Sequence, residues 1–132
     1  MNREEINEYD LGLPVPIAPL EQRRRGVPAA VWAALRRFEQ DLTAFLGGRL
    51  QQVVLFGSYA RNQFDDESDV DVLVLIEALE PADRDRIIET AVRCSTADII
   101  LSPLILTVTQ LAALRAREML IAADIDREGI VL

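Results

Sequence analysis

The most informative absence in this sequence of 132 residues is histidine, of which there is none. Histidine is the side chain that enzymes most often use as a general base, and it is the commonest metal ligand in proteins. Cysteine is almost absent as well, since Cys94 is the only one. A zinc site is therefore nearly excluded, and no internal disulfide bond can form, which agrees with a reducing compartment. Catalysis by this chain has to depend on carboxylates and on a hard cation that prefers oxygen ligands.

Long hydrophobic runs are also missing. Charge or proline interrupts every apolar stretch within about ten residues, whereas a membrane-spanning helix needs roughly twenty. Residues 1–5 are polar and contain no apolar signal region, so we expect a cytoplasmic protein that makes no membrane contact. Basic residues are outnumbered by acidic ones, 14 against 22, which gives a net charge of −8. This charge argues against direct nucleic-acid binding and favours either solubility or a basic partner.

The chain is predicted to consist of an N-terminal arm, residues 1–27, and one domain, residues 28–132. Half of the residues are apolar, which is enough for the core of a single domain. Three prolines, Pro14, Pro16 and Pro19, are incompatible with a regular helix and predict an extended segment that packs on the body or trails from it. The triplet Arg23–Arg25 that follows either contacts a phosphate or an acidic partner, or is a solvated linker; the second interpretation is favoured.

Within the domain, patterns typical of helices and strands alternate. Pro28 starts a helix with apolar residues at helical spacing, and Gly47 and Gly48 end it. The strongest strand spans 69–76, where the near-continuous apolar run indicates burial on both faces of a sheet. The remaining predictions are a strand over 51–56, a short helix from Tyr59, a helix from Pro81, a strand over 97–101, a last helix capped by Thr109 and an edge strand over 129–132. The expected fold is α/β, with a small sheet and helices packed on it.

Two acids open the strand over 69–76. Asp69 and Asp71 are two residues apart, so their side chains project from the same face, about 6–7 Å apart at the backbone. Neighbouring carboxylates repel each other and are costly to desolvate, and a divalent cation such as Mg²⁺ or Mn²⁺ removes that cost. A plain solvated loop edge is the alternative interpretation of the Asp-x-Asp pattern taken alone.

The residues just after the preceding strand make the metal interpretation stronger. Gly57 allows a tight turn that brings backbone amides close to a phosphate, and Ser58 adds a hydroxyl donor. A short helix starting at Ser58 or Tyr59 would direct its first amides at the same anion. A Gly-Ser turn at the end of one strand, with Asp-x-Asp opening the next, is a far more specific signal than either motif alone.

This arrangement resembles the signature of the polymerase-β-like nucleotidyltransferase superfamily. The pattern is Gly57-Ser58, ten residues, then Asp69-Val70-Asp71, with Ala60-Arg61 and Ser68 in matching flanking positions. The most similar group is the minimal nucleotidyltransferases, which include the antitoxins of MNT/HEPN toxin–antitoxin systems. The resemblance extends more loosely over about 31–132. It implies a mixed sheet with helices on one side, a nucleoside triphosphate held at Gly57 and Ser58, and metal at Asp69 and Asp71.

The resemblance also implies a third acid on the next strand. Asp98 is the matching candidate, and it would complete the metal site and take the proton of the attacking hydroxyl. The competing interpretation is an aspartate that caps a turn at the start of a strand. Arg61 is expected to contact phosphate, although an ion pair with Asp65 or Asp66 is an equal alternative.

The resulting functional hypothesis is a Mg²⁺-dependent enzyme, with Mn²⁺ as an alternative metal, that transfers AMP from ATP to an acceptor hydroxyl. By resemblance to the antitoxin group, the acceptor is expected to be a tyrosine of a cognate, basic HEPN ribonuclease toxin, and the acidic chain suits such a partner. Two alternatives remain open. One is a non-catalytic module that neutralises its partner by covering it, and the other is an enzyme that modifies a small molecule.

Overall fold

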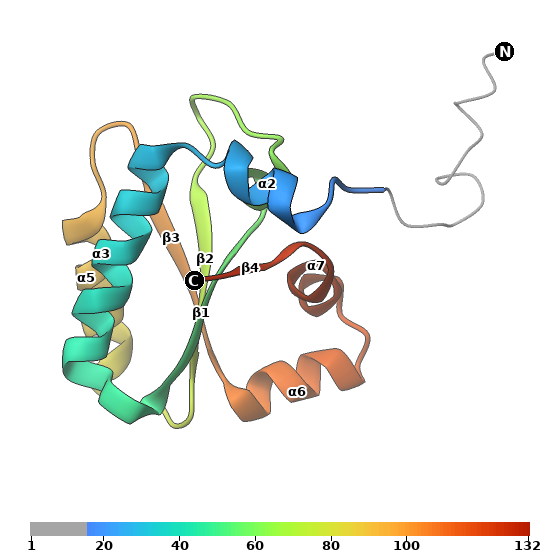
Figure 1. The fold of residues 1–132 in the computed structure, drawn as a ribbon. Coiled ribbons are helices and arrows are strands. Elements are labelled where there is room, and N and C mark those ends of the chain that lie inside the picture. Colours follow the sequence, from blue (N-terminus) through green and yellow to red (C-terminus); the bar gives the residue numbers. More distant parts are fainter. Residues whose placement is uncertain (1–15) are drawn as a thin grey trace, which may run out of the picture.

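The computed structural model of the protein describes residues 16–132 and shows a four-stranded mixed sheet with helices on both faces (Figure 1). Its strands have the order β3-β2-β1-β4; β2 runs antiparallel to β1 and parallel to β3, and β4 runs antiparallel to β1. The elements are α2 (Leu20–Gly26), α3 (Ala29–Leu46), the 3₁₀ turn η2 (Gly47–Arg49), β1 (Leu50–Phe56), α4 (Ser58–Arg61), β2 (Val70–Ile76), α5 (Asp83–Cys94), β3 (Leu101–Thr107), α6 (Val108–Ala116), α7 (Leu120–Glu128) and β4 (Ile130–Val131). Within the described residues, none of the helices combines the length and the apolar character that crossing a membrane would require.

Strand β2 is buried on both faces, as its sequence predicts, and alternate side chains enter two different cores. Val70, Val72, Val74 and Ile76 pack in the core that α3 and α5 cover. The side chains between them on the strand, such as Leu73 and Leu75, pack against α6 and α7. Asp71 has the same parity as this second set, so it lies on the α6/α7 face of the sheet.

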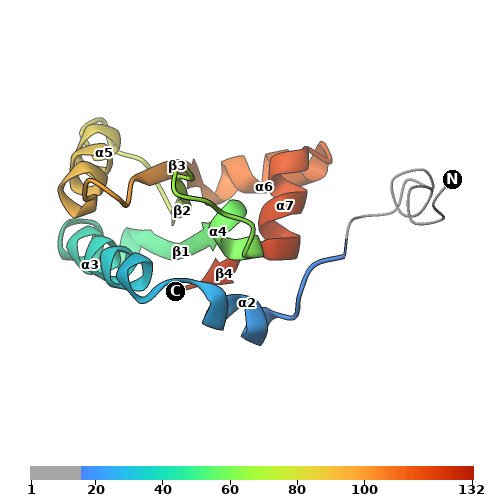
Figure 2. The ribbon, with the colours of Figure 1, turned by 90° about the horizontal axis from the view of Figure 1, so that it is seen from above.

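The sheet therefore has helices on both sides, and the implied arrangement with helices on one side is wrong. Viewed from above, α3 and α5 form one layer and α6 and α7 the other, with the strands between them (Figure 2). The second layer exists because the middle of β2 and the end of β1 present apolar side chains on that face too, and these need cover from water.

Helix α3 follows the sequence prediction closely. It begins directly after Pro28 and buries a stripe of side chains that includes Leu35, Phe38 and Leu42. Gly47 ends it with a φ of 55°, a backbone conformation that glycine adopts readily.

The third strand and the last helix differ from their predictions. β3 spans Leu101–Thr107 rather than 97–101, because Pro103 is tolerated in a strand at the edge of the sheet. The helix near the C-terminus begins after Thr107, whose side chain forms a capping box with Gln110. It is two helices, not one, because the backbone breaks at Glu118 with a φ of 53°.

The segment before Pro28 packs on the body. Residues 20–26 form helix α2, and Arg23, on the buried side of this helix, is 4% exposed. The prediction of a solvated linker is therefore wrong for Arg23, and so is the alternative of a contact with a phosphate or an acidic partner. The prediction of an extended arm fails over 20–26, while its part before residue 16 lies outside the described residues. The boundary between 27 and 28 stays a prediction.

Candidate active site

The site lies where β1 ends and β2 begins. These strands are antiparallel neighbours, and Phe56 pairs with Asp71 in the register. The turn that follows β1 is therefore brought directly beside the acids that open β2. Gly57 and Asp71, which are distant in sequence, are thus in contact, as the sequence interpretation requires.

Asp69 and Asp71 are close enough to interact electrostatically but differ in environment. Asp69 is exposed just before β2, whereas Asp71 is half-buried at its second position. Burial, followed by the charge of Asp69, raises the pKa of the Asp71 carboxyl above its ordinary value, and Arg61 opposes this effect. The positive charge of Arg61 is therefore not enough to offset the burial of Asp71 and the negative charge of Asp69.

Gly57 is needed in this turn for two reasons. Its φ of 76° and ψ of −157° lie in a region that is essentially restricted to glycine. A Cβ atom at this position would also collide with Oδ2 of Asp71 and lie only 3.0 Å from its Cγ. The space that a side chain would fill at residue 57 is therefore occupied by the Asp71 carboxylate.

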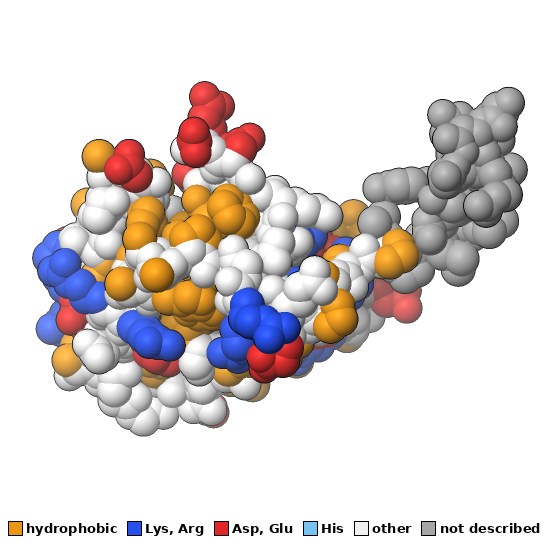
Figure 3. All heavy atoms as spheres, turned by 45° about the horizontal axis from the view of Figure 1, so that its top comes forward, with side chains coloured by type: hydrophobic (Ala, Val, Ile, Leu, Met, Phe, Trp, Pro, Cys, Tyr) orange, Lys and Arg blue, Asp and Glu red, His pale blue; other side chains and the backbone are white. Residues whose placement is uncertain are grey.

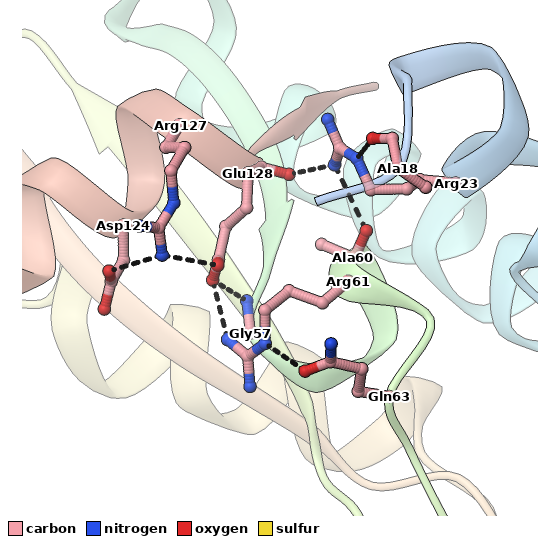
Figure 4. Close-up of polar contacts among 9 residues, drawn as sticks. All are labelled: Ala18, Arg23, Gly57, Ala60, Arg61, Gln63, Asp124, Arg127 and Glu128. Carbon is pink, nitrogen blue, oxygen red and sulfur yellow. Dashed lines mark hydrogen bonds and ion pairs between the residues drawn. The ribbon is translucent and has the colours of Figure 1, made fainter. Parts of the chain in front are cut away.

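The backbone amide of Gly57 has a partner within the protein. It donates to Oε1 of Glu128 at 3.0 Å, so this N–H is directed at α7 (Figure 4). The same oxygen accepts from Nη1 of Arg61 at 2.9 Å. Arg61 thus pairs with neither Asp65 nor Asp66, the two acids considered from the sequence. Its contact with phosphate, like the nucleotide contacts of Gly57 and Ser58, stays a prediction.

Glu128 is the residue of this site that sequence reasoning missed. Its side chain is 1% exposed, and it lies 71 residues from Gly57 in the chain. An Arg-Glu-Gly run at the end of a helix is an ordinary pattern, and no local signal links it to a turn in another part of the sequence. Only the packing of α7 against β1 brings the two together.

Asp98 is not brought to the acid pair. It is exposed in the loop before β3, and it lines a groove of about 430 Å³ together with Ala30, Ala33 and Arg37 of α3. That groove is on the α3/α5 side of the molecule, opposite the face of Asp71. The strand position beside Asp71 is held by Ser102. Because β3 starts at Leu101, Asp98 lies three residues before the strand that was expected to carry it. The geometry therefore does not support Asp98 as the third acid of the site.

The residues present fit a hard cation held by two carboxylates. Asp69 is accessible, and Asp71 has the raised pKa of an under-compensated acid. Among residues 16–132, no three acidic or cysteine side chains converge as a complete metal cage. Mg²⁺ commonly takes only one or two protein carboxylates and keeps its other positions for water and substrate phosphates. This donor set therefore suits a cation that arrives with a nucleotide.

The chain is similar to several known proteins. MJ0141 of Methanocaldococcus jannaschii, provisionally named a protein adenylyltransferase, is 42% identical over 73 residues, which are 54% of this chain and 74% of that protein. MJ0604 of the same organism carries the same provisional name and is 40% identical over 42 residues, 32% of this chain and 42% of that protein. A crystal structure of a mutant toxin–antitoxin, MntA-HpeT, is similar with a TM-score of 0.48 and 18% identity, covering 70% of this chain and 68% of that one.

The family model of the nucleotidyltransferase domain matches residues 35–113, more than half of the chain. This range contains the Gly57–Ser58 turn and the two acids Asp69 and Asp71. The chain belongs to the nucleotidyltransferase domain family, and it is a nucleotidyltransferase.

Proposed function

We propose that this nucleotidyltransferase transfers AMP from ATP, in the presence of Mg²⁺, to a hydroxyl group of a protein partner. The observation that carries the proposal is the contact between the Gly57 turn and Asp71, with Asp69 accessible beside them. The Gly57 turn and the two acids lie at one end of the central strands β1 and β2, which supports a phosphate-binding turn next to two cation ligands.

The chemistry is a displacement at the α-phosphorus of ATP. The acceptor oxygen forms the new bond to phosphorus, the bond to the β-phosphate oxygen breaks, and pyrophosphate leaves with the electron pair. The proton of the hydroxyl is released to water. A bound Mg²⁺ supplies charge neutralisation on the phosphates. Asp69 and Asp71 would hold that ion, and Ser58, half-buried at the start of α4, would donate its hydroxyl to a phosphate.

The acceptor is proposed to be a protein with a basic surface. The loop between α4 and β2 carries the exposed acids Asp65, Asp66 and Glu67, next to the exposed Asp69. Acidic side chains stand out at the top of the molecule in Figure 3. The relative with 42% identity is named for protein adenylylation, and the sequence motif resembles that of antitoxins. The favoured partner is therefore a basic HEPN-type toxin with a tyrosine acceptor.

The test is a transfer assay with two labels. The protein is incubated with Mg²⁺, the product of the neighbouring gene, and ATP labelled at either the α- or the γ-phosphate. We expect the α-label to enter the partner and the γ-label to stay out. Asp71→Asn should abolish labelling, and Asp126→Asn, which removes an exposed acid of α7, should leave it unchanged. Entry of the γ-label, or transfer by Asp71→Asn at the wild-type rate, would contradict the proposal.

The masking alternative is tested by protection of cells that produce the toxin. Asp71→Asn keeps the shape of the surface, so a protein that acts only by covering its partner would protect cells as well as the wild type does. Transfer to an added small alcohol or aminoglycoside instead of the protein would point to the small-molecule alternative.

A further inference from the structure

The side chain of Glu128 connects the two parts of the site that are predicted to meet phosphate. Its Oε1 accepts from the backbone amide of Gly57 and from the guanidinium of Arg61 (Figure 4). Gly57 in turn lies against the carboxylate of Asp71. One oxygen atom therefore fixes both the backbone of the turn and the direction of the Arg61 side chain.

Burying the carboxylate of Glu128 at this position is energetically unfavourable. It is 1% exposed, and burying a carboxylate costs several kcal/mol before its partners are counted. Its second oxygen, Oε2, makes no hydrogen bond within the described residues, and Nη2 of Arg127 lies 3.9 Å from it. A residue that served stability alone would be better replaced by a well-packed apolar side chain. The buried charge is instead used to bind Gly57 and Arg61 through Oε1.

Arg23 holds the backbone around this contact. Its guanidinium donates to the carbonyl of Ala60 in α4 at 3.1 Å and to the carbonyl of Glu128 at the end of α7 at 2.6 Å. Its Nε donates to the carbonyl of Ala18 at 2.8 Å. The buried guanidinium of Arg23 thus bonds to backbone carbonyls of both α4 and α7. Oε1 of Glu128 connects the same two parts of the chain through Gly57 and Arg61. Neither segment can shift without losing contacts to the other.

Arg61 is held by Glu128 along only part of its edge. Nη1 is bound to Glu128, and Nε lies 3.3 Å from the side-chain oxygen of Gln63. The side chain remains 31% exposed, and a guanidinium has five N–H donors in a rigid fork. Donors are therefore left for a ligand on the Asp71 side, where the charge of Arg61 is already felt.

We propose that Glu128 is a positioning residue, which fixes the Gly57 turn and aims Arg61 at the triphosphate without touching the substrate itself. This inference rests on the proposed function, because the ligand at Arg61 is the nucleotide of that reaction. It differs from a purely structural role in one respect. A structural residue affects folding, whereas a positioning residue acts on nucleotide binding through Arg61 in protein that is fully folded.

The test is a double-mutant cycle in folded protein. Glu128→Gln keeps the shape and an oxygen that can accept from Gly57, but it removes the charge that orients Arg61. We expect the KM for ATP to rise about ten- to a hundredfold, as for loss of a charge-assisted hydrogen bond, with a smaller change in kcat. Arg61→Gln should show a similar rise, and the double variant should be no worse than Arg61→Gln alone. Asp126→Asn, which removes an exposed ion pair between α7 and Arg115 of α6, is the control and should match the wild type.

A second measurement does not depend on turnover. Hydrogen exchange of the Gly57 amide, followed by NMR without nucleotide, should be at least tenfold faster in Glu128→Ala than in the wild type. Where a variant fails to fold, Glu128→Asp keeps the charge on a shorter side chain and should change both readouts in the same direction. Unchanged Gly57 exchange, or additive effects of Glu128→Gln and Arg61→Gln on KM, would overturn the inference. A wild type that transfers no AMP would overturn the proposed function and leave the exchange measurement as the test of Glu128.

Discussion

Replacing Gly57 by alanine should destabilise the protein through Asp71, a residue on another strand. The backbone at residue 57, with φ 76° and ψ −157°, costs a non-glycine residue about 1–3 kcal/mol. The added Cβ would also meet Oδ2 and Cγ of Asp71, and displacing a packed side chain costs about another 1–3 kcal/mol. Gly57→Ala should therefore lower the free energy of unfolding by roughly 2–6 kcal/mol.

A double-mutant cycle with Asp71→Ala separates these two costs. In that background Oδ2 and Cγ are gone, and only the 3.1 Å approach to the Cβ of residue 71 remains. The backbone cost should persist while most of the steric cost disappears. We therefore expect a coupling energy of about 1–3 kcal/mol, clearly above the 0.3–0.5 kcal/mol scatter of independent sites. Denaturant unfolding of the four proteins measures it.

Additive behaviour within about 0.5 kcal/mol would refute the reasoning, because it would mean that the carboxylate does not lie over Gly57. The cycle also bears on nucleotide binding. Loss of ATP binding in a Gly57 variant has two explanations, a blocked approach to the phosphate or a displaced Asp71. Only a variant that leaves Asp71 in place, such as Ser58→Ala, reports on the turn alone.

Three further predictions concern stability. Burial raises the pKa of Asp71 in the folded state, so ionisation of this carboxyl opposes folding. With a metal chelator present, Asp71→Asn should therefore have a higher melting temperature than the wild type at neutral pH. The difference should vanish below about pH 4, where the carboxyl is protonated in the unfolded wild type as well. The hydrogen bond from Arg49 lowers the pKa of Asp83, so the ionised carboxylate stabilises the fold. Asp83→Asn should lower the free energy of unfolding by about 1–3 kcal/mol at neutral pH, as measured by denaturant unfolding. This difference should shrink below about pH 4, where acid protonates Asp83 in the wild type. Phe38→Ala should cost about 3–5 kcal/mol because Phe38 is fully buried, while Val92→Ala, at a side chain 69% exposed, should cost far less; equal losses would contradict the assigned core.

The parts of the fold that sequence predicted well are those fixed by local patterns. The continuous apolar run identified β2 as a doubly buried strand, and Pro28 and Gly47 marked the ends of α3. The antiparallel pairing of β1 and β2, which places Gly57 beside Asp71, was not predicted, because the segment over 57–69 that joins the two strands includes α4 and does not by itself fix their direction.

The parts that failed depend on position in the sheet. The strand predicted over 97–101 lies instead at Leu101–Thr107, because an edge strand does not need every backbone donor and so includes Pro103; Asp98 is left in the preceding loop. Arg23 looked like part of a charged surface run because nothing in the triplet shows which arginine has carbonyl oxygens waiting for it. The role of Glu128 was invisible because it depends on a contact between residues 71 positions apart.

The contacts of Arg23 also determine when during synthesis the site can take its final form. Its bond to the carbonyl of Glu128 joins residues 105 positions apart, and the bond from Gly57 to Glu128 spans most of the domain as well. Pairings so distant in sequence form only after long chain loops have closed. On a ribosome that adds roughly 5–20 residues per second, Asp69 and Asp71 emerge several seconds before α7. A nascent chain would therefore display these two acids before α7 is available to hold the Gly57 turn in place.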